Sequence, residues 1–139
     1  MNKIFSKKYW PSLLLIILIL FLQIITHVVQ KKFITTLNDG WFFGIAKCNF
    51  WSVIFSLFLL AVLFVIQKKH SRFTGAIILI AGGAISNMLE RIIYGGIVDY
   101  VSVGAFPVFN LADIFITGGC IVLISNAFLS SKKSPREIV

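Results

Sequence analysis

The sequence predicts an all-α membrane protein with four transmembrane helices and a small extracytoplasmic β-like hairpin on the outer face. Of its 139 residues, 58% are hydrophobic and only 13% are charged, whereas a soluble domain usually has about 25% charged residues. A soluble domain of this length has too little interior to bury so much apolar surface, and disorder requires low hydrophobicity. The apolar residues also gather in four stretches, each near the roughly 17–25 residues that cross a bilayer.

We expect one membrane domain over residues 1–139, because no composition shift or linker divides the chain. The helices are expected at about 11–29, 51–66, 73–93 and 111–129. They must be helical because lipid offers no hydrogen-bond partner to the backbone. The first stretch follows three lysines, as in a signal peptide, but Thr26-His27-Val28-Val29-Gln30 replaces a small-residue cleavage site. We therefore expect an uncleaved first helix.

Basic residues indicate the orientation. With four spans, the two tails and the loop between the second and third helices share one side, which carries nine basic residues: Lys3, Lys7, Lys8, Lys68, Lys69, Arg72, Lys132, Lys133 and Arg136. The other side has Lys31, Lys32 and Lys47, with Arg91 near a helix end. The positive-inside rule therefore predicts cytoplasmic termini and outer loops at 31–50 and 95–109. The net charge of +8 thus reflects topology and not a nucleic-acid surface.

The first outer loop contains a strong turn signal. Asn38-Asp39-Gly40 lies between Phe33-Ile34-Thr35-Thr36 and Trp41-Phe42-Phe43, and such a turn between apolar runs is typical of a β-hairpin. We expect this hairpin to lie on the outer surface.

Polar residues of the helices share faces near the outer ends. The stripes comprise Gln23, Thr26, His27 and Gln30; Asn49, Ser52 and Ser56; Gly83, Asn87, Glu90, Arg91 and Tyr94; and Asn110, Asp113 and Thr117. Because successive helices run in opposite directions, all four stripes should converge in the outer half of the membrane. The inner halves are nearly pure hydrocarbon. A transporter needs polar groups on both sides of the midplane, so a one-sided pocket favours an enzyme at the outer surface.

Two aspartates in this region suggest acid–base catalysis by a pair of carboxyl groups. Asp99 and Asp113 each lie in an apolar segment near the outer boundary, beside the ends of the third and fourth helices. Two carboxyl groups brought together tend to share one proton. One can then activate water while the other protonates a carbonyl or leaving group, which is aspartic-protease chemistry. Spacing alone leaves open a structural ion pair between Arg91 and an acidic residue.

Four segments resemble the lipoprotein signal peptidase (signal peptidase II) family. Gly82-Gly83-Ala84-Ile85-Ser86-Asn87-Met88-Leu89-Glu90-Arg91 is similar to its Gly-Gly-Ala…Asn…Asp-Arg motif. Gly96-Ile97-Val98-Asp99-Tyr100 is similar to Val-Val-Asp-Phe, and Phe109-Asn110-Leu111-Ala112-Asp113 to Phe-Asn-x-Ala-Asp. Asn38-Asp39-Gly40-Trp41-Phe42-Phe43-Gly44 is a weaker match to Asn-x-Gly-x-x-Phe. The order and spacing agree over nearly the whole chain.

The resemblance implies an aspartic endopeptidase of the bacterial cytoplasmic (inner) membrane. Such an enzyme removes the signal peptide of diacylglyceryl-modified prolipoproteins by cutting before the lipidated cysteine. By this resemblance Asp99 and Asp113 are catalytic, and the residues expected to bind substrate are Asn38, Asn87, Arg91 and Asn110. The expected partners are the prolipoprotein and membrane lipid, with the chain a monomer and no nucleic acid bound. No cofactor is implied, and no metal site is expected because no second His or Cys accompanies His27.

This chain departs from the family pattern at several positions. Leu22 stands where an Asp is expected, and the Lys expected after Gln23 is absent, with His27 the nearest basic residue. Glu90 replaces the usual Asp, and Ser86 replaces the usual Gly. One alternative is a catalytically inactive lipid- or lipopeptide-binding membrane protein of the same fold. The acidic residues within the membrane leave open a second alternative, a small transporter.

Overall fold

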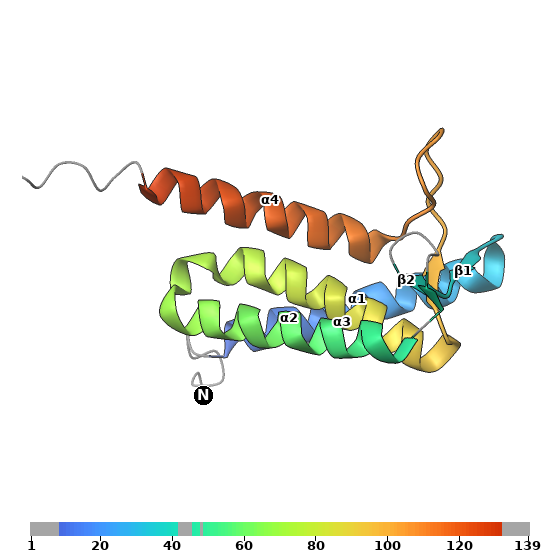
Figure 1. Cartoon of the computed structure of the whole chain (residues 1–139), viewed down its shortest axis with the longest axis horizontal. Helices are drawn as coiled ribbons and strands as arrows, with labels where there is room; N and C mark the ends of the chain where they lie inside the picture. The colour runs from blue at the N-terminus through green and yellow to red at the C-terminus, as the bar shows by residue number, and fades with distance from the viewer. Residues whose placement is uncertain (1–8, 42–45, 48, 132–139) are drawn as a thin grey trace, which may run out of the picture.

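Four long helices make up most of the molecule (Figure 1). The computed structural model describes residues 9–41, 46–47 and 49–131. The helices are α1 (Trp10–Lys32), α2 (Asn49–Lys69), α3 (Thr74–Tyr94) and α4 (Leu111–Ser131), with the short 3₁₀ helix η1 (Ser71–Phe73) before α3. All four are long and apolar enough to cross a membrane, which confirms the predicted architecture.

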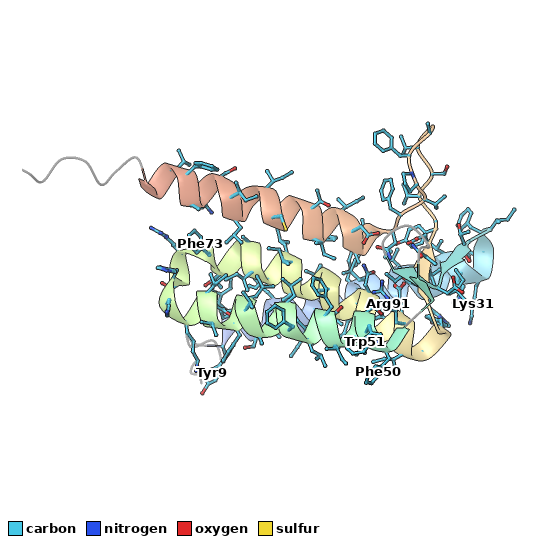
Figure 2. All side chains as sticks on the ribbon, viewed as in Figure 1. Tyr9, Lys31, Phe50, Trp51, Phe73 and Arg91 are labelled. Atoms are coloured by element: carbon cyan, nitrogen blue, oxygen red, sulfur yellow. The ribbon has the colours of Figure 1, made fainter. Side chains whose placement is uncertain are left out.

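The helices extend past the expected bounds where basic residues flank the apolar runs. α1 continues through Lys31 and Lys32, and α2 continues through Lys68 and Lys69. Their long side chains can reach polar surroundings while the backbone stays helical. Near the other helix ends lie exposed aromatic residues (Figure 2): Tyr9 before α1, and Phe50 and Trp51 in the first turn of α2. Aromatic side chains at both ends of a bundle are typical of membrane interfaces.

Helix α3 is the centre of the bundle and contacts each of the other three helices. Small residues allow this close approach. A Cβ built at Gly82 would lie 2.5 Å from the Leu18 side chain of α1, and one at Gly83 would lie 2.6 Å from the backbone oxygen of Ala112 in α4. Gly82 and Gly83 therefore permit close packing of α3 against α1 and α4. Away from these contacts, Leu63, Phe73, Ile77 and Ile80 form a buried apolar cluster.

The short strands gather at one end of the bundle (Figure 1). β1 (Thr36–Asn38) pairs antiparallel with β4 (Ile97–Asp99), with Thr36 opposite Asp99. β2 (Gly40–Trp41) pairs with β3 (Ala46–Lys47). The expected β structure is therefore present, but its pairing differs: the segment before Asn38-Asp39-Gly40 joins a strand from the other outer loop. Gly95, in the left-handed conformation with φ 77°, ends α3 and returns the chain so that the apolar strand β4 is buried beside β1.

Between β4 and α4 the chain forms a narrow loop that projects away from the helices (Figure 1). Backbone hydrogen bonds between Val101 and Phe109 close its base. At its tip Gly104 has φ 57°, a conformation that glycine adopts at little cost. Phe106 of this loop is 73% exposed.

Candidate active site

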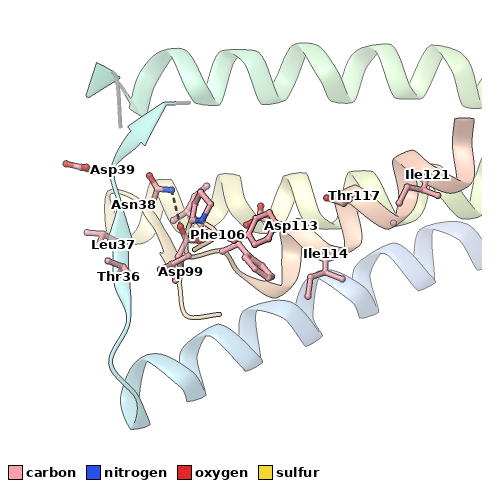
Figure 3. Close-up of a pocket in the computed structure, with 15 residues that line it drawn as sticks. Thr36, Leu37, Asn38, Asp39, Asp99, Phe106, Asp113, Ile114, Thr117 and Ile121 are labelled. Atoms are coloured by element: carbon pink, nitrogen blue, oxygen red, sulfur yellow. Dashed lines mark hydrogen bonds between the residues drawn. The ribbon is translucent and has the colours of Figure 1, made fainter. Parts of the chain in front are cut away.

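A pocket of about 1430 Å³ opens at the end of the bundle that carries the strands (Figure 3). Asp99, Asp113 and Asn38 are among its lining residues. One long side is apolar, formed by Ile114, Thr117, Gly118 and Ile121 on one face of α4 and by residues 106–109 of the projecting loop. The two aspartates that the sequence singled out therefore face the same cavity, although β4 and α4 lie on either side of that loop.

Asp113 is held by a reciprocal cap at the start of α4. The Asp113 backbone N–H donates to Asn110 Oδ1 at 3.0 Å, and the Asn110 backbone N–H donates to Asp113 Oδ2 at 3.1 Å. This is the capping-box arrangement with Asn and Asp in place of the usual Ser or Thr and Glu. The segment Asn110-Leu111-Ala112-Asp113 thus both starts the helix and fixes the Asp113 carboxylate at its N-terminal end.

Asn87 of α3 completes a ring of side chains around Asp113. Its amide Nδ2 donates to Asp113 Oδ1 at 2.9 Å, and its Oδ1 accepts from Asn110 Nδ2 at 2.9 Å. Both asparagines are buried. Two N–H groups therefore donate to the Asp113 carboxylate, one to each oxygen. Asn87 and Asn110 do not line the pocket. They orient the Asp113 side chain through these hydrogen bonds.

Asp99 has a very different environment. It is 3% exposed, and its Oδ2 accepts from Asn38 Nδ2 at 3.0 Å. Its Oδ1 is buried and accepts no hydrogen bond from the described residues. Burial raises the pKa of the Asp99 carboxyl to about 6; the Asn38 hydrogen bond opposes this rise, the charges of Asp113 and Glu90 add to it, and Arg91 opposes it. Asp99 is therefore suited to carry a proton near neutral pH.

Arg91 is half-buried and lies near enough to Asp99 to influence its pKa. Glu90, its neighbour in sequence, uses both carboxylate oxygens elsewhere: Oε1 accepts from Thr26 Oγ1 and Oε2 from the Val98 backbone N–H. The Arg91 guanidinium interacts electrostatically with Asp113, Asp99 and Glu90.

Not every polar stripe reaches the pocket. On α1, Gln23 donates to Ser86 Oγ at 2.8 Å and Thr26 donates to Glu90, whereas His27 and Gln30 are exposed. Ser56 of α2 donates back to the Ser52 carbonyl within its own helix, and neither serine lines the pocket. Of the predicted stripe residues, Asp113 and Thr117 of α4 line the pocket, and Asn87 of α3 reaches it only through its hydrogen bond to Asp113. The described side chains of the α1 and α2 stripes do not line it. Side chains one residue apart on a helix point about 100° apart, so Thr26 and His27 face different surroundings.

Fold and pocket together define the class of this protein, an α-helical integral membrane protein with a paired-carboxylate pocket at one end of its helices. The chain belongs to the signal peptidase II family, since the family model described as signal peptidase (SPase) II matches residues 15–129. It is 38% identical over 104 residues to the lipoprotein signal peptidase of Caldicellulosiruptor bescii, covering 73% of this chain and 67% of that one. With the lipoprotein signal peptidase of Syntrophomonas wolfei it shares 36% identity over 107 residues, covering 72% and 70%.

Solved structures support the fold independently. A bacterial membrane enzyme determined by the in meso method at 2.3 Å resolution superposes with a TM-score of 0.79 at 22% identity, covering 93% of each chain. A second such structure, at 1.9 Å, gives a TM-score of 0.75 at 23% identity, covering 86% of this chain and 92% of that one. Four-helix architecture and family membership are thus established by separate comparisons.

Proposed function

We propose that this protein removes the signal peptide from diacylglyceryl-modified bacterial prolipoproteins, cutting before the lipidated cysteine, with Asp99 and Asp113 as an aspartic catalytic pair. The observation that carries this proposal is that both carboxylates line one pocket with a long apolar side. Membership of the signal peptidase II family supports the same substrate class. The apolar side formed by α4 suits a substrate that brings both an apolar helix and acyl chains.

The different environments of the two aspartates suggest that one acts as the general base and the other as the general acid. Asp113 accepts two hydrogen bonds and lies at the N-terminus of α4, which suits a carboxylate that acts as a base. Asp99 has a raised pKa and an unpartnered Oδ1, which suits a carboxylic acid. We assign the shared proton to Asp99.

In this scheme Asp113 takes a proton from water as the water oxygen attacks the scissile carbonyl carbon. Asp99 donates its proton to the carbonyl oxygen, which gives a gem-diol. Asp113 then passes its proton to the amide nitrogen of the cysteine, the C–N bond breaks, and Asp99 recovers a proton from one gem-diol hydroxyl. The products are the signal-peptide carboxyl group and the amine of the lipidated cysteine, and both aspartates return to their starting states.

The proposed activity is tested by incubating the purified protein in detergent with a diacylglyceryl-modified prolipoprotein and following signal-peptide release by gel shift. The control reaction uses the same prolipoprotein without the diacylglyceryl group. We expect release from the lipidated substrate only. Binding without cleavage would favour the lipopeptide-binding alternative, and solute-specific flux in liposomes would favour a transporter.

We also propose that the pocket faces the outer side of the bacterial inner membrane, with both chain termini in the cytoplasm. The family and the four apolar helices support a multi-pass membrane protein, and the basic residues support this orientation. A topology reporter fused after Val139 or inserted near Lys69 should read as cytoplasmic, and one near Asp39 as external. The reverse pattern would place the pocket away from exported substrates and contradict the proposal.

Replacing Asn38 is expected to change the pH dependence of cleavage. Asp99 must be protonated in this scheme, so kcat/KM should fall about tenfold per pH unit above its pKa of about 6. The Asn38 amide stabilises the ionised form of Asp99 through its hydrogen bond. Asn38→Leu removes this bond, raises the Asp99 pKa and should move the alkaline limb to higher pH.

The control for this measurement is Ser56→Ala, which changes a side chain of α2 outside the pocket and should leave the limb in place. A limb that moves to lower pH in Asn38→Leu, or a profile that is flat to pH 9 in the parent protein, would contradict the assignment of the proton to Asp99.

Arg91 is proposed to anchor the substrate backbone or lipid headgroup. A guanidinium can bind carbonyl, carboxylate or phosphate oxygens through two parallel N–H groups, whereas the Lys ammonium offers a single point charge. We expect Arg91→Lys to lower kcat/KM at least about tenfold, the equivalent of about 1.4 kcal/mol. The melting temperature in detergent should hardly change, because lysine keeps the positive charge at this half-buried position. Parallel losses of stability and activity would instead indicate a structural role.

A further inference from the structure

Glu90 is a buried acidic residue for which the catalytic scheme has no use. Its side chain is 1% exposed and it does not line the pocket. A buried carboxylate is costly unless its oxygens accept hydrogen bonds. Both of them do: Oε1 accepts from the Thr26 hydroxyl of α1 at 2.8 Å, and Oε2 accepts from the Val98 backbone N–H of β4 at 2.9 Å. The carboxylate therefore joins α1, α3 and the strand that carries Asp99.

The contact with Val98 bears on the register of β4. Side chains alternate along a strand, and here Ile97 and Asp99 line the pocket while Val98 is buried away from it. A shift of one residue would turn Asp99 out of the pocket and bring a neighbour in. The ladder that opposes such a shift is only three residues long and has two strands, and a sheet of this size is marginally stable by itself.

We infer that Glu90 is a positioning residue, whose carboxylate fixes β4 against α3 so that Asp99 faces Asp113. The Val98 N–H is donated to Glu90, so β4 is held by β1 through its pairing and by α3 through this carboxylate. This bond depends on the reach of the side chain and not on its charge, because a neutral side-chain carbonyl oxygen at the same place also accepts from an N–H group. A single such bond is a substantial addition to a three-residue ladder.

Tyr100, the residue after Asp99, connects the chain that follows β4 to the start of α4. The Tyr100 hydroxyl accepts from the Leu111 backbone N–H at 3.2 Å, in the first turn of the helix that carries Asp113. The backbone on each side of Asp99 is thus tied to the helices, before it through Val98 and Glu90, and after it through Tyr100 and α4.

This inference rests on the proposed function, and its test separates the length of the Glu90 side chain from its charge. Glu90→Gln keeps the length, and its amide can accept from Val98 and donate to Thr26. Glu90→Asp keeps the charge but is one C–C bond, about 1.5 Å, shorter, so it cannot reach both partners from the same helix position. We expect Gln to retain most of kcat and Asp to lose at least about tenfold in kcat with little change in KM.

A second readout does not depend on cleavage. Amide hydrogen exchange in detergent, followed by mass spectrometry over residues 96–100, should be faster in Glu90→Asp and unchanged in Glu90→Gln. Leu63→Ala, which destabilises the apolar cluster far from the strands, should lower the melting temperature without a selective change in this segment. These exchange measurements are also made in the Asp113→Asn background, where cleavage is expected to be at least about 100-fold slower.

The outcomes are distinguishable. If the parent protein does not cleave prolipoprotein but exchange still quickens in Glu90→Asp, the proposed function fails and the positioning of β4 stands. If Glu90→Asp matches the parent in kcat and in exchange, the inference is overturned. It is equally overturned if Gln is impaired as much as Asp, because Gln preserves both contacts.

Discussion

The Asp99→Asn and Asp113→Asn variants are each expected to cleave lipidated prolipoprotein at least about 100-fold more slowly than the parent protein. Loss of a general acid or base typically lowers the rate by roughly 10²–10⁴-fold. Asparagine has nearly the shape of aspartate, but its amide neither gives nor takes the proton at the required step. Both carboxylates line the same pocket, so each substitution leaves only one of the two aspartates there. The measurement is single-turnover cleavage with purified variants at matched concentration.

Thermal stability serves as the folding control for these variants. The folded-state pKa of Asp99, about 6, lies above its ordinary value of 3.8. Its contribution to stability is therefore fully present below about pH 3.8 and is lost as the pH rises through about 6. Asn does not ionise, so Asp99→Asn should melt at a higher temperature than the parent at pH 8, with a smaller difference at pH 5. Near-parental turnover in either variant would refute the aspartic mechanism.

Gly83→Ala is expected to impair both stability and cleavage. The added methyl carbon would lie 2.6 Å from the Ala112 backbone oxygen and 2.7 Å from Ile116 Cγ1, so the first turn of α4 must move away from α3. Overpacking of this kind costs about 1–3 kcal/mol. Asp113 lies in the displaced turn and is bonded to Asn87 of α3. Because a misplacement of about 1 Å can cost about 10²-fold in rate, we expect roughly that loss in kcat.

Gly75→Ala is the matched control on the same helix. No atom outside its chain neighbours and helix backbone lies within 4 Å of a Cβ at this position, and Ala is favoured over Gly in a helix by about 0.5–1 kcal/mol. We expect an unchanged or slightly higher melting temperature and parental cleavage. Parental cleavage by Gly83→Ala as well would show that the contact between α3 and α4 does not control the position of Asp113.

Local pattern predicted the features of this molecule that depend on short stretches of chain. The apolar runs predicted four membrane-spanning helices, because lipid permits few other backbone structures. Asn110 and Asp113 stand three residues apart at a helix start, so their reciprocal cap is also a local property. The motifs around Asn87, Asp99 and Asp113 indicated the family, and the family model confirms it.

Tertiary structure alone decided which segments meet at the pocket. The turn signal at Asn38-Asp39-Gly40 predicted a hairpin, yet β1 pairs with β4 from the other outer loop, and this brings Asn38 to Asp99 across 61 positions of sequence. The bond of Glu90 to Thr26 of α1 spans 64 positions. Such partners carry no signal in a local pattern, because they are chosen by the packing of α3 against its neighbours and by the need to satisfy buried polar groups. The chain determined by itself where its helices run and which acids it carries, whereas packing decided that Asn87 would reach Asp113 and that Asp99 would be buried with one oxygen unpartnered.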